Sequence, residues 1–106
     1  MKNDILVYLK NSFGLEGAEG EELFESYVDT VNENIAKIKE ALPSERLEDL
    51  VRAAHSIKGC ALNCGHTPMA DASKEAEFAG KARNISEYKT ALAKMEAIAA
   101  ALNAER

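Results

Sequence analysis

Residues 24–42 read FESYVDTVNENIAKIKEAL, a stretch with two columns of apolar residues that each recur every seven positions. The columns hold Phe24, Val31 and Ile38, and Val28, Ile35 and Leu42. Such columns form a seam along one side of a helix, suited to packing at a shallow angle against neighbouring helices. The stretch therefore predicts a long helix over about residues 21–42 inside a helical bundle.

The rest of the chain carries the same kind of pattern. Helix-period stripes recur almost everywhere, and strand-like alternation never persists. Breaks near Gly14–Gly20, Pro43-Ser44, Gly65–Pro68 and Gly80–Asn84 separate one short helix from four longer ones. Because short connections favour antiparallel neighbours, we expect an all-α fold, an antiparallel up-down four-helix bundle with a short additional N-terminal helix.

This bundle would occupy residues 21–104, and the N-terminal helix and turn, residues 1–20, would cap one end of it. A chain of 106 residues is long enough for one small core, so we expect residues 1–106 to form a single domain.

Several polar residues predict where the later helices begin. Ser44 is expected to cap the third helix. Thr67 is expected to cap the fourth, with Pro68 as its first residue. Asn84 and Glu87 resemble a capping box at the start of the fifth helix.

Composition narrows the classes of function. The formal net charge of −5 argues against a nucleic-acid binder, which usually carries a basic patch and a high pI. The N-terminus MKNDILVYLKNSF lacks the features of a signal peptide, and no apolar run approaches the length of a membrane span. We therefore expect a cytoplasmic protein that binds neither nucleic acid nor membrane.

Residues 53–66, AAHSIKGCALNCGH, hold both histidines and both cysteines of the chain. His55 falls in the middle of the third helix, one step around from a core stripe that passes through Ala54 and Ile57, so it should face outward. The residues that share its side of the helix are Val51, Arg52, Lys58, Gly59 and Leu62.

The neighbours of His55 suggest phosphoryl chemistry. Neutral imidazole is a good nucleophile near neutral pH, and Lys58, one turn away, is placed to contact an anion on the ring. Gly59 costs roughly 1 kcal/mol relative to alanine inside a helix, which suggests that something large must approach the ring closely. The chain has no phosphate loop and no carboxylate cluster for magnesium, so a partner would have to supply the metal and the phosphoryl donor or acceptor.

At these residues the sequence resembles the histidine-containing phosphotransfer (HPt) domains. In that family a histidine is followed by lysine at the third position, glycine at the fourth, and often a polar residue at the eighth and glycine at the tenth. Here these residues are His55, Lys58, Gly59, Asn63 and Gly65. Downstream, MADASKEAEFAGKA is similar to the family's next helix, and the resemblance in length and helix layout covers about residues 20–104.

The resemblance implies a phosphocarrier of a two-component phosphorelay rather than an enzyme. His55 would exchange a phosphoryl group with the aspartate of a response-regulator receiver domain, or be charged by a hybrid histidine kinase. Mg²⁺ would be held by the receiver, and Lys58 would stabilise the phosphohistidine. Gly59 would give the partner clearance, and the surface that binds it would include Val51, Arg52, Leu62 and Asn63.

Other interpretations stay open. The chain resembles the phosphotransfer segment of a chemotaxis-type kinase equally well, and a helical module that binds partners without carrying phosphate is a further alternative. Cys60, Cys64 and His66 suggest a metal site, but their spacing fits zinc poorly. We therefore expect no metal, half-buried cysteines, and a His66 that lies at the surface or caps a helix.

Overall fold

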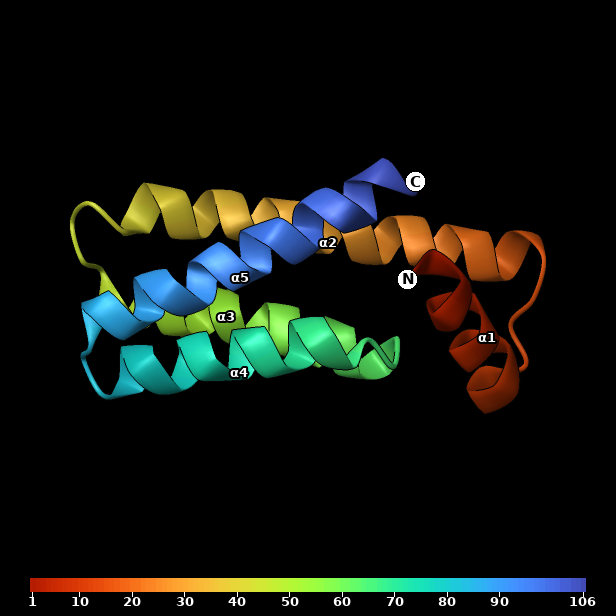
Figure 1. Ribbon diagram of the computed structural model, residues 1–106, viewed down its shortest axis with the longest axis horizontal. Coiled ribbons are helices and arrows are strands. Elements are labelled where there is room, and N and C mark those ends of the chain that lie inside the picture. Colours follow the sequence, from red (N-terminus) through yellow and green to blue (C-terminus); the bar gives the residue numbers. More distant parts are fainter.

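The computed structural model describes residues 1–106, and it contains five helices and no strand (Figure 1). The helices are α1 (Lys2–Phe13), α2 (Ala18–Ala41), α3 (Leu47–Asn63), α4 (Thr67–Lys81) and α5 (Ile85–Ala104). The all-α fold expected from the sequence is confirmed. The seam helix begins three residues before the predicted start, because residues 18–20 already adopt helical geometry.

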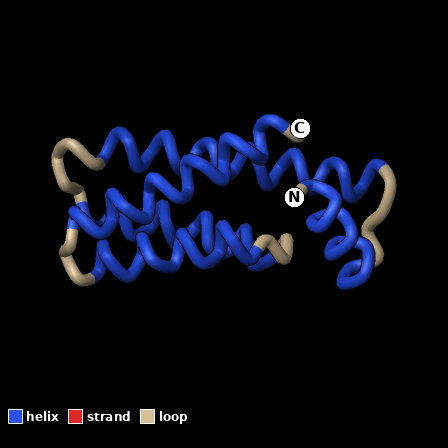
Figure 2. The backbone as a smooth tube through the Cα atoms, viewed as in Figure 1, coloured by secondary structure: helices blue, strands red, loops and turns tan.

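Helices α2 to α5 form an antiparallel up-down bundle, and the whole molecule is elongated, with extents of 42 × 21 × 18 Å. Helix α3 packs between α2 and α4, and α5 packs against α4 and α2. Short turns join these four helices at alternating ends (Figure 2). Their backbones therefore hold α3 and α4 side by side along most of their length.

The apolar seam of α2 forms one wall of the core. Phe24, Val28, Val31 and Ile38 are fully buried, whereas Leu42 at the end of the seam is half-buried. The facing walls contain mainly small side chains from α3 and α4, together with larger ones from α5. Small residues permit the close approach of α3 and α4 that the candidate site needs.

Helix α1 lies across one end of the bundle, as the sequence suggested (Figure 1). Its own residues Ile5 and Leu9 are buried and belong to the hydrophobic core. Its N-terminus is held near the C-terminus of the chain, because the backbone N–H of Lys2 donates to the Glu105 carboxylate at 3.2 Å.

The prediction that Ser44 caps α3 is wrong. Helix α2 closes with a bond from the Arg46 N–H to the Ala41 carbonyl at 3.2 Å, and Glu45 adopts a left-handed backbone with φ 49°. Ser44 lies inside this Schellman-type turn, so it is not at the start of α3. Helix α3 begins at Leu47, with Arg46 as its N-cap residue.

The starts of α4 and α5 agree more closely with the sequence. His66 rather than Thr67 is the N-cap of α4, so Thr67 is the first helical residue and the prediction is wrong by one position. At α5 the Asn84 side chain accepts a hydrogen bond from the Glu87 N–H at 3.0 Å, which confirms the predicted cap.

Candidate functional site

His55 lies near the middle of α3 with its ring exposed, at 65% of the maximum for the side chain. The flanking residues Ala54 and Ile57 are fully buried, so the opposite side of α3 fixes the backbone beneath the ring. The ring is therefore held by a packed helix and open to a second molecule.

Glu77 of α4 is the partner of His55, and sequence reasoning gave it no role. Its Oε2 lies 2.8 Å from Nδ1 of His55, and its side chain is only 7% exposed. A signal was available, because Glu77 shares a face of α4 with the small buried residues Ser73, Ala76 and Gly80. A charged residue on such a face requires partners on the neighbouring helix.

Lysine side chains complete the surroundings of this carboxylate. Lys58 donates to Oε1 of Glu77 at 2.6 Å, and Nζ of Lys81 lies 3.5 Å from Oε2. Desolvation would raise the pKa of Glu77. The hydrogen bonds from Lys58 and His55, with the charges of Lys58 and Lys81, outweigh it and lower the pKa from 4.5 to about 2. Glu77 is thus ionised at neutral pH.

The ionised carboxylate determines the tautomer of His55. A carboxylate only accepts hydrogen bonds, so Nδ1 of His55 must carry the proton that it donates to Glu77. In the neutral ring, Nε2 then keeps its lone pair. The exposed imidazole therefore offers one nucleophilic nitrogen, oriented by a buried acid on the next helix.

Gly59 lies on the exposed side of α3, one turn after His55. A methyl group built at this position would meet no atom within 4 Å. Packing therefore does not require glycine here, in contrast to Gly80, where a methyl group would lie 2.7 Å from Cγ2 of Val51. The open space above Gly59 agrees with the clearance expected from the sequence.

The other residues expected at the site lie on two sides of His55. Val51 and Arg52 line a groove of about 460 Å³ between α3 and α4, together with His55 and Glu77. Leu62 and Asn63 are exposed toward the other end of α3 and do not line that groove. Leu62 leaves 58% of its surface open to solvent.

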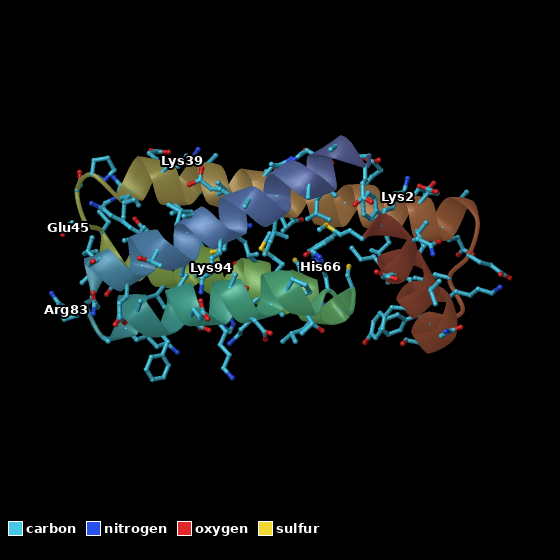
Figure 3. All side chains as sticks on the ribbon, in the orientation of Figure 1. Lys2, Lys39, Glu45, His66, Arg83 and Lys94 are labelled. Carbon is cyan, nitrogen blue, oxygen red and sulfur yellow. The ribbon has the colours of Figure 1, made fainter.

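The expectation that His66 lies at the surface is wrong, whereas the alternative, that it caps a helix, is confirmed, because His66 is the N-cap residue of α4. His66 is 5% exposed, and its side chain caps nothing although its backbone is the N-cap of α4. Its Nδ1 lies 2.6 Å from the hydroxyl of Tyr27 on α2, and Nε2 has no partner. Figure 3 labels His66 where α3 turns into α4, and its contact with Tyr27 directs the ring toward α2.

The two cysteines are unpaired, Cys60 half-buried and Cys64 buried. Burial raises the pKa of Cys64 to about 11, with a smaller contribution from the charge of Cys60, and burial also raises the pKa of Cys60. Both thiols are therefore protonated at neutral pH and poorly reactive. No group of three or more His, Cys, Asp or Glu side chains is placed to hold a metal ion.

No helix combines the length and the apolar character that spanning a bilayer requires. Comparison with curated proteins and with solved structures gave no significant match. The family model of the Hpt domain, in contrast, matches residues 22–105, which contain the whole of α3, α4 and α5 and all but the first turn of α2. Hpt domains are phosphocarriers of His–Asp phosphorelays and work with receiver domains and histidine kinases. With an exposed, oriented histidine on a helical bundle and a family match over most of its length, the chain belongs to the Hpt domain family.

Proposed function

We propose that this protein carries a phosphoryl group on Nε2 of His55 in a two-component phosphorelay. The observation that supports this most directly is the pairing of His55 with Glu77, which keeps Nδ1 protonated and leaves Nε2 free on an exposed surface. The chain would be a carrier, because its partner supplies Mg²⁺ and most of the catalytic groups.

In the proposed step, the lone pair of Nε2 attacks the phosphorus of a receiver's aspartyl phosphate. The N–P bond forms as the P–O bond to the aspartate breaks, and the aspartate leaves as a carboxylate. The proton on Nδ1 stays in place. Glu77 stabilises the positive charge that the ring acquires, since its Oε2 lies 2.8 Å from Nδ1.

Two neighbours assist this step. Lys58 is one turn from His55 and partly exposed, so its ammonium group is placed to contact the phosphoryl oxygens as well as Glu77. Gly59 leaves room for the partner's active-site loops, because nothing lies within 4 Å of the position its Cβ would take. The partner surface would further use Val51, Arg52, Leu62 and Asn63.

We place this function in the cytoplasm, with response-regulator receiver domains or a hybrid histidine kinase as partners. Two free cysteines agree with a reducing compartment. A role as the phosphotransfer segment of a chemotaxis-type kinase uses the same chemistry. A module that never carries phosphate is disfavoured, because such a module has no need of the His55–Glu77 pair.

The proposal is tested by incubation with a phosphorylated receiver domain and, separately, with phosphoramidate, a small donor that needs no docking surface. Both should give an acid-labile, base-stable label. His55→Gln should abolish the label without changing the helical circular dichroism, and Lys58→Ala should shorten the lifetime of the phosphohistidine. His66→Gln is the matched control and should still be labelled. A label that persists in His55→Gln would overturn the proposal.

A further inference from the structure

The groove beside His55 is rich in positive charge. Between the first half of α3 and the last turn of α4 it is lined by Arg52, Lys81 and Arg83, with Val51 and Leu47 as apolar floor. Its acidic residues are Glu48 and Glu77, and the charge of Glu77 is compensated by Lys58 and Lys81. The chain as a whole has a net charge of −5, so this groove differs in sign from the rest of the molecule.

Two of the three cations of the groove are weakly engaged within the protein, whereas Lys81 lies 3.5 Å from the buried Glu77 carboxylate. Arg83 makes no ion pair, and Arg52 reaches only Asp49, at 3.7 Å and with 76% of its side chain exposed. Arg106 shows what an engaged arginine looks like in this fold, with bonds to both Glu25 and Asp29. An exposed ion pair such as Arg52–Asp49 contributes little free energy. Arg52 and the unpaired Arg83 are therefore available to an external anion.

Arg83 also occupies an unfavourable backbone position. It closes α4 with φ 59°, and Asn84 N–H donates to the Ala79 carbonyl at 2.9 Å in the same pattern that ends α3 at Gly65, where φ is 64°. Left-handed geometry favours glycine over residues with a Cβ. Figure 3 shows the exposed side chain of Arg83 extending outward from the turn after α4.

We propose that this groove binds an acidic segment of the receiver domain that exchanges phosphate with His55, and that Arg52 and Arg83 select partners carrying such a segment. This inference rests on the proposed function of His55. The occupant is assigned by charge complementarity and by position, since His55 itself lines the groove. Any molecule that reaches the ring from this side must cover Arg52, and electrostatic complementarity of this kind chiefly raises association rates.

The test measures phosphoryl transfer between the full chain and a receiver domain that accepts phosphate from the wild-type protein. Rates are taken at subsaturating receiver and divided by the rate of labelling with phosphoramidate. Arg83→Gly and Arg52→Ala should each lower the normalised rate constant about 3- to 10-fold, and together about 10- to 100-fold. The wild-type rate should fall as salt rises from about 50 to 300 mM, and the double variant should lose most of this dependence.

The matched control is Glu45→Gly, because Glu45 has the same left-handed backbone in the α2–α3 turn and lies outside the groove. It should leave the normalised rate within about twofold of wild type, the spread expected for a surface charge away from the contact. Because the Arg83→Gly change relieves an unfavourable backbone, its melting temperature should equal or exceed that of wild type. A slower transfer therefore cannot come from unfolding.

Transfer rates of both arginine variants within about twofold of wild type would overturn the groove proposal while leaving His55 as the phosphoacceptor. Self-association of the wild-type chain at low salt that disappears in Arg83→Gly would also overturn it, because the groove would then bind an acidic face of a second copy. Failure of phosphoramidate to label the wild-type protein at His55 is the separate result that refutes the proposed function.

Discussion

At the scale of single residues, Glu77 determines the chemistry of the candidate site. It holds the proton on Nδ1 of His55 and anchors Lys58, and these contacts lower its pKa to about 2. A carboxyl whose pKa is lower in the folded state than in the unfolded state stabilises the fold at pH values above its unfolded pKa. That contribution is lost as the pH falls from about 4.5 toward 2.

We therefore predict that Glu77→Gln weakens the dependence of stability on pH in the acidic range. The ionised Glu77 should contribute about 2 kcal/mol at neutral pH, after allowance for solvent around His55 and Lys81. Urea unfolding at pH 7, 4 and 3 measures this, with Glu75→Gln as the control on the exposed face of α4. If the free energy of unfolding falls equally with pH in wild type and in Glu77→Gln, the pKa of Glu77 is not lowered by its contacts with Lys58 and His55.

The same substitution should also slow the reaction of His55. In Glu77→Gln the new amide oxygen still accepts the hydrogen bond from Nδ1, but the amide carries no charge to stabilise an imidazolium. We expect labelling by phosphoramidate to slow about 3- to 10-fold, the loss of roughly 1 kcal/mol of transition-state stabilisation. Quenched time courses of labelling at pH 7 give the rate. If Glu77→Gln is labelled as fast as wild type, Glu77 has only a structural role.

At the scale of the elements, the contact between α3 and α4 brings His55 to Glu77. Gly80 permits this contact, since a methyl group there would lie 2.7 Å from Cγ2 of Val51, whereas Gly59 on the open face of α3 has no such neighbour. The packing of α3 against α4 therefore requires a glycine at position 80 but not at position 59.

We predict opposite effects of alanine at these glycines. Gly80→Ala should destabilise the fold by about 1–3 kcal/mol through overpacking. Gly59→Ala should stabilise it by up to about 1 kcal/mol, because alanine is the better helix former. Thermal unfolding measures both. If Gly59→Ala proves as destabilising as Gly80→Ala, the space above Gly59 is not open.

A second contact between elements joins α2 to the start of α4, where the hydroxyl of Tyr27 meets Nδ1 of His66. Burial lowers the pKa of His66 below 6.5, with a smaller contribution in the same direction from the N-terminal amino group, while the charge of Glu105 opposes the shift. The hydroxyl of Tyr27 lies 2.6 Å from Nδ1 of His66, and it stays protonated because burial raises its pKa. A histidine that is neutral in the folded state stabilises the fold above its unfolded pKa, so stability should fall as the pH drops below about 6.5.

We predict that His66→Phe removes this decline between pH 6.5 and 5, because phenylalanine fills a similar volume and does not titrate. The free energy of unfolding in urea, measured across that pH range, tests this prediction. Tyr27→Phe separately tests the hydrogen bond between Tyr27 and His66. This substitution should cost about 1–3 kcal/mol at pH 7 by leaving Nδ1 of His66 unpaired. A decline that survives in His66→Phe would assign the acid sensitivity to another group.

At the scale of the whole molecule, sequence patterns predicted the fold more completely than the site. The seam of Phe24, Val28, Val31 and Ile38 predicts one buried face of α2, and with the short connections between the later helices it predicts a bundle. The start of α3 was missed because Glu45 takes a left-handed conformation normally reserved for glycine. Local sequence rules do not anticipate this.

The site illustrates the same division. His55, Lys58 and Gly59 lie within one helix, so their shared face follows from helical spacing. Glu77 comes from a different helix, 22 residues along the chain, and only packing brings it to the ring. The position of His66 at the start of α4 was predicted, but its burial was missed for a related reason, since that depends on its contact with Tyr27 of α2. Contacts within a helix were predictable, and contacts between helices were not.

We further propose that residues 1–106 fold as one domain, because α1 is tied to the bundle through buried Ile5 and Leu9 and through the contact of Lys2 with Glu105. The central claim concerns one atom of that domain, Nε2 of His55. Its most direct test is nuclear magnetic resonance of the protein labelled with ¹⁵N-histidine and treated with phosphoramidate. We predict a single phosphorus–nitrogen coupling, to Nε2 of His55, with Nδ1 still protonated and His66 unchanged. Coupling to Nδ1 of His55, or to His66, would contradict it.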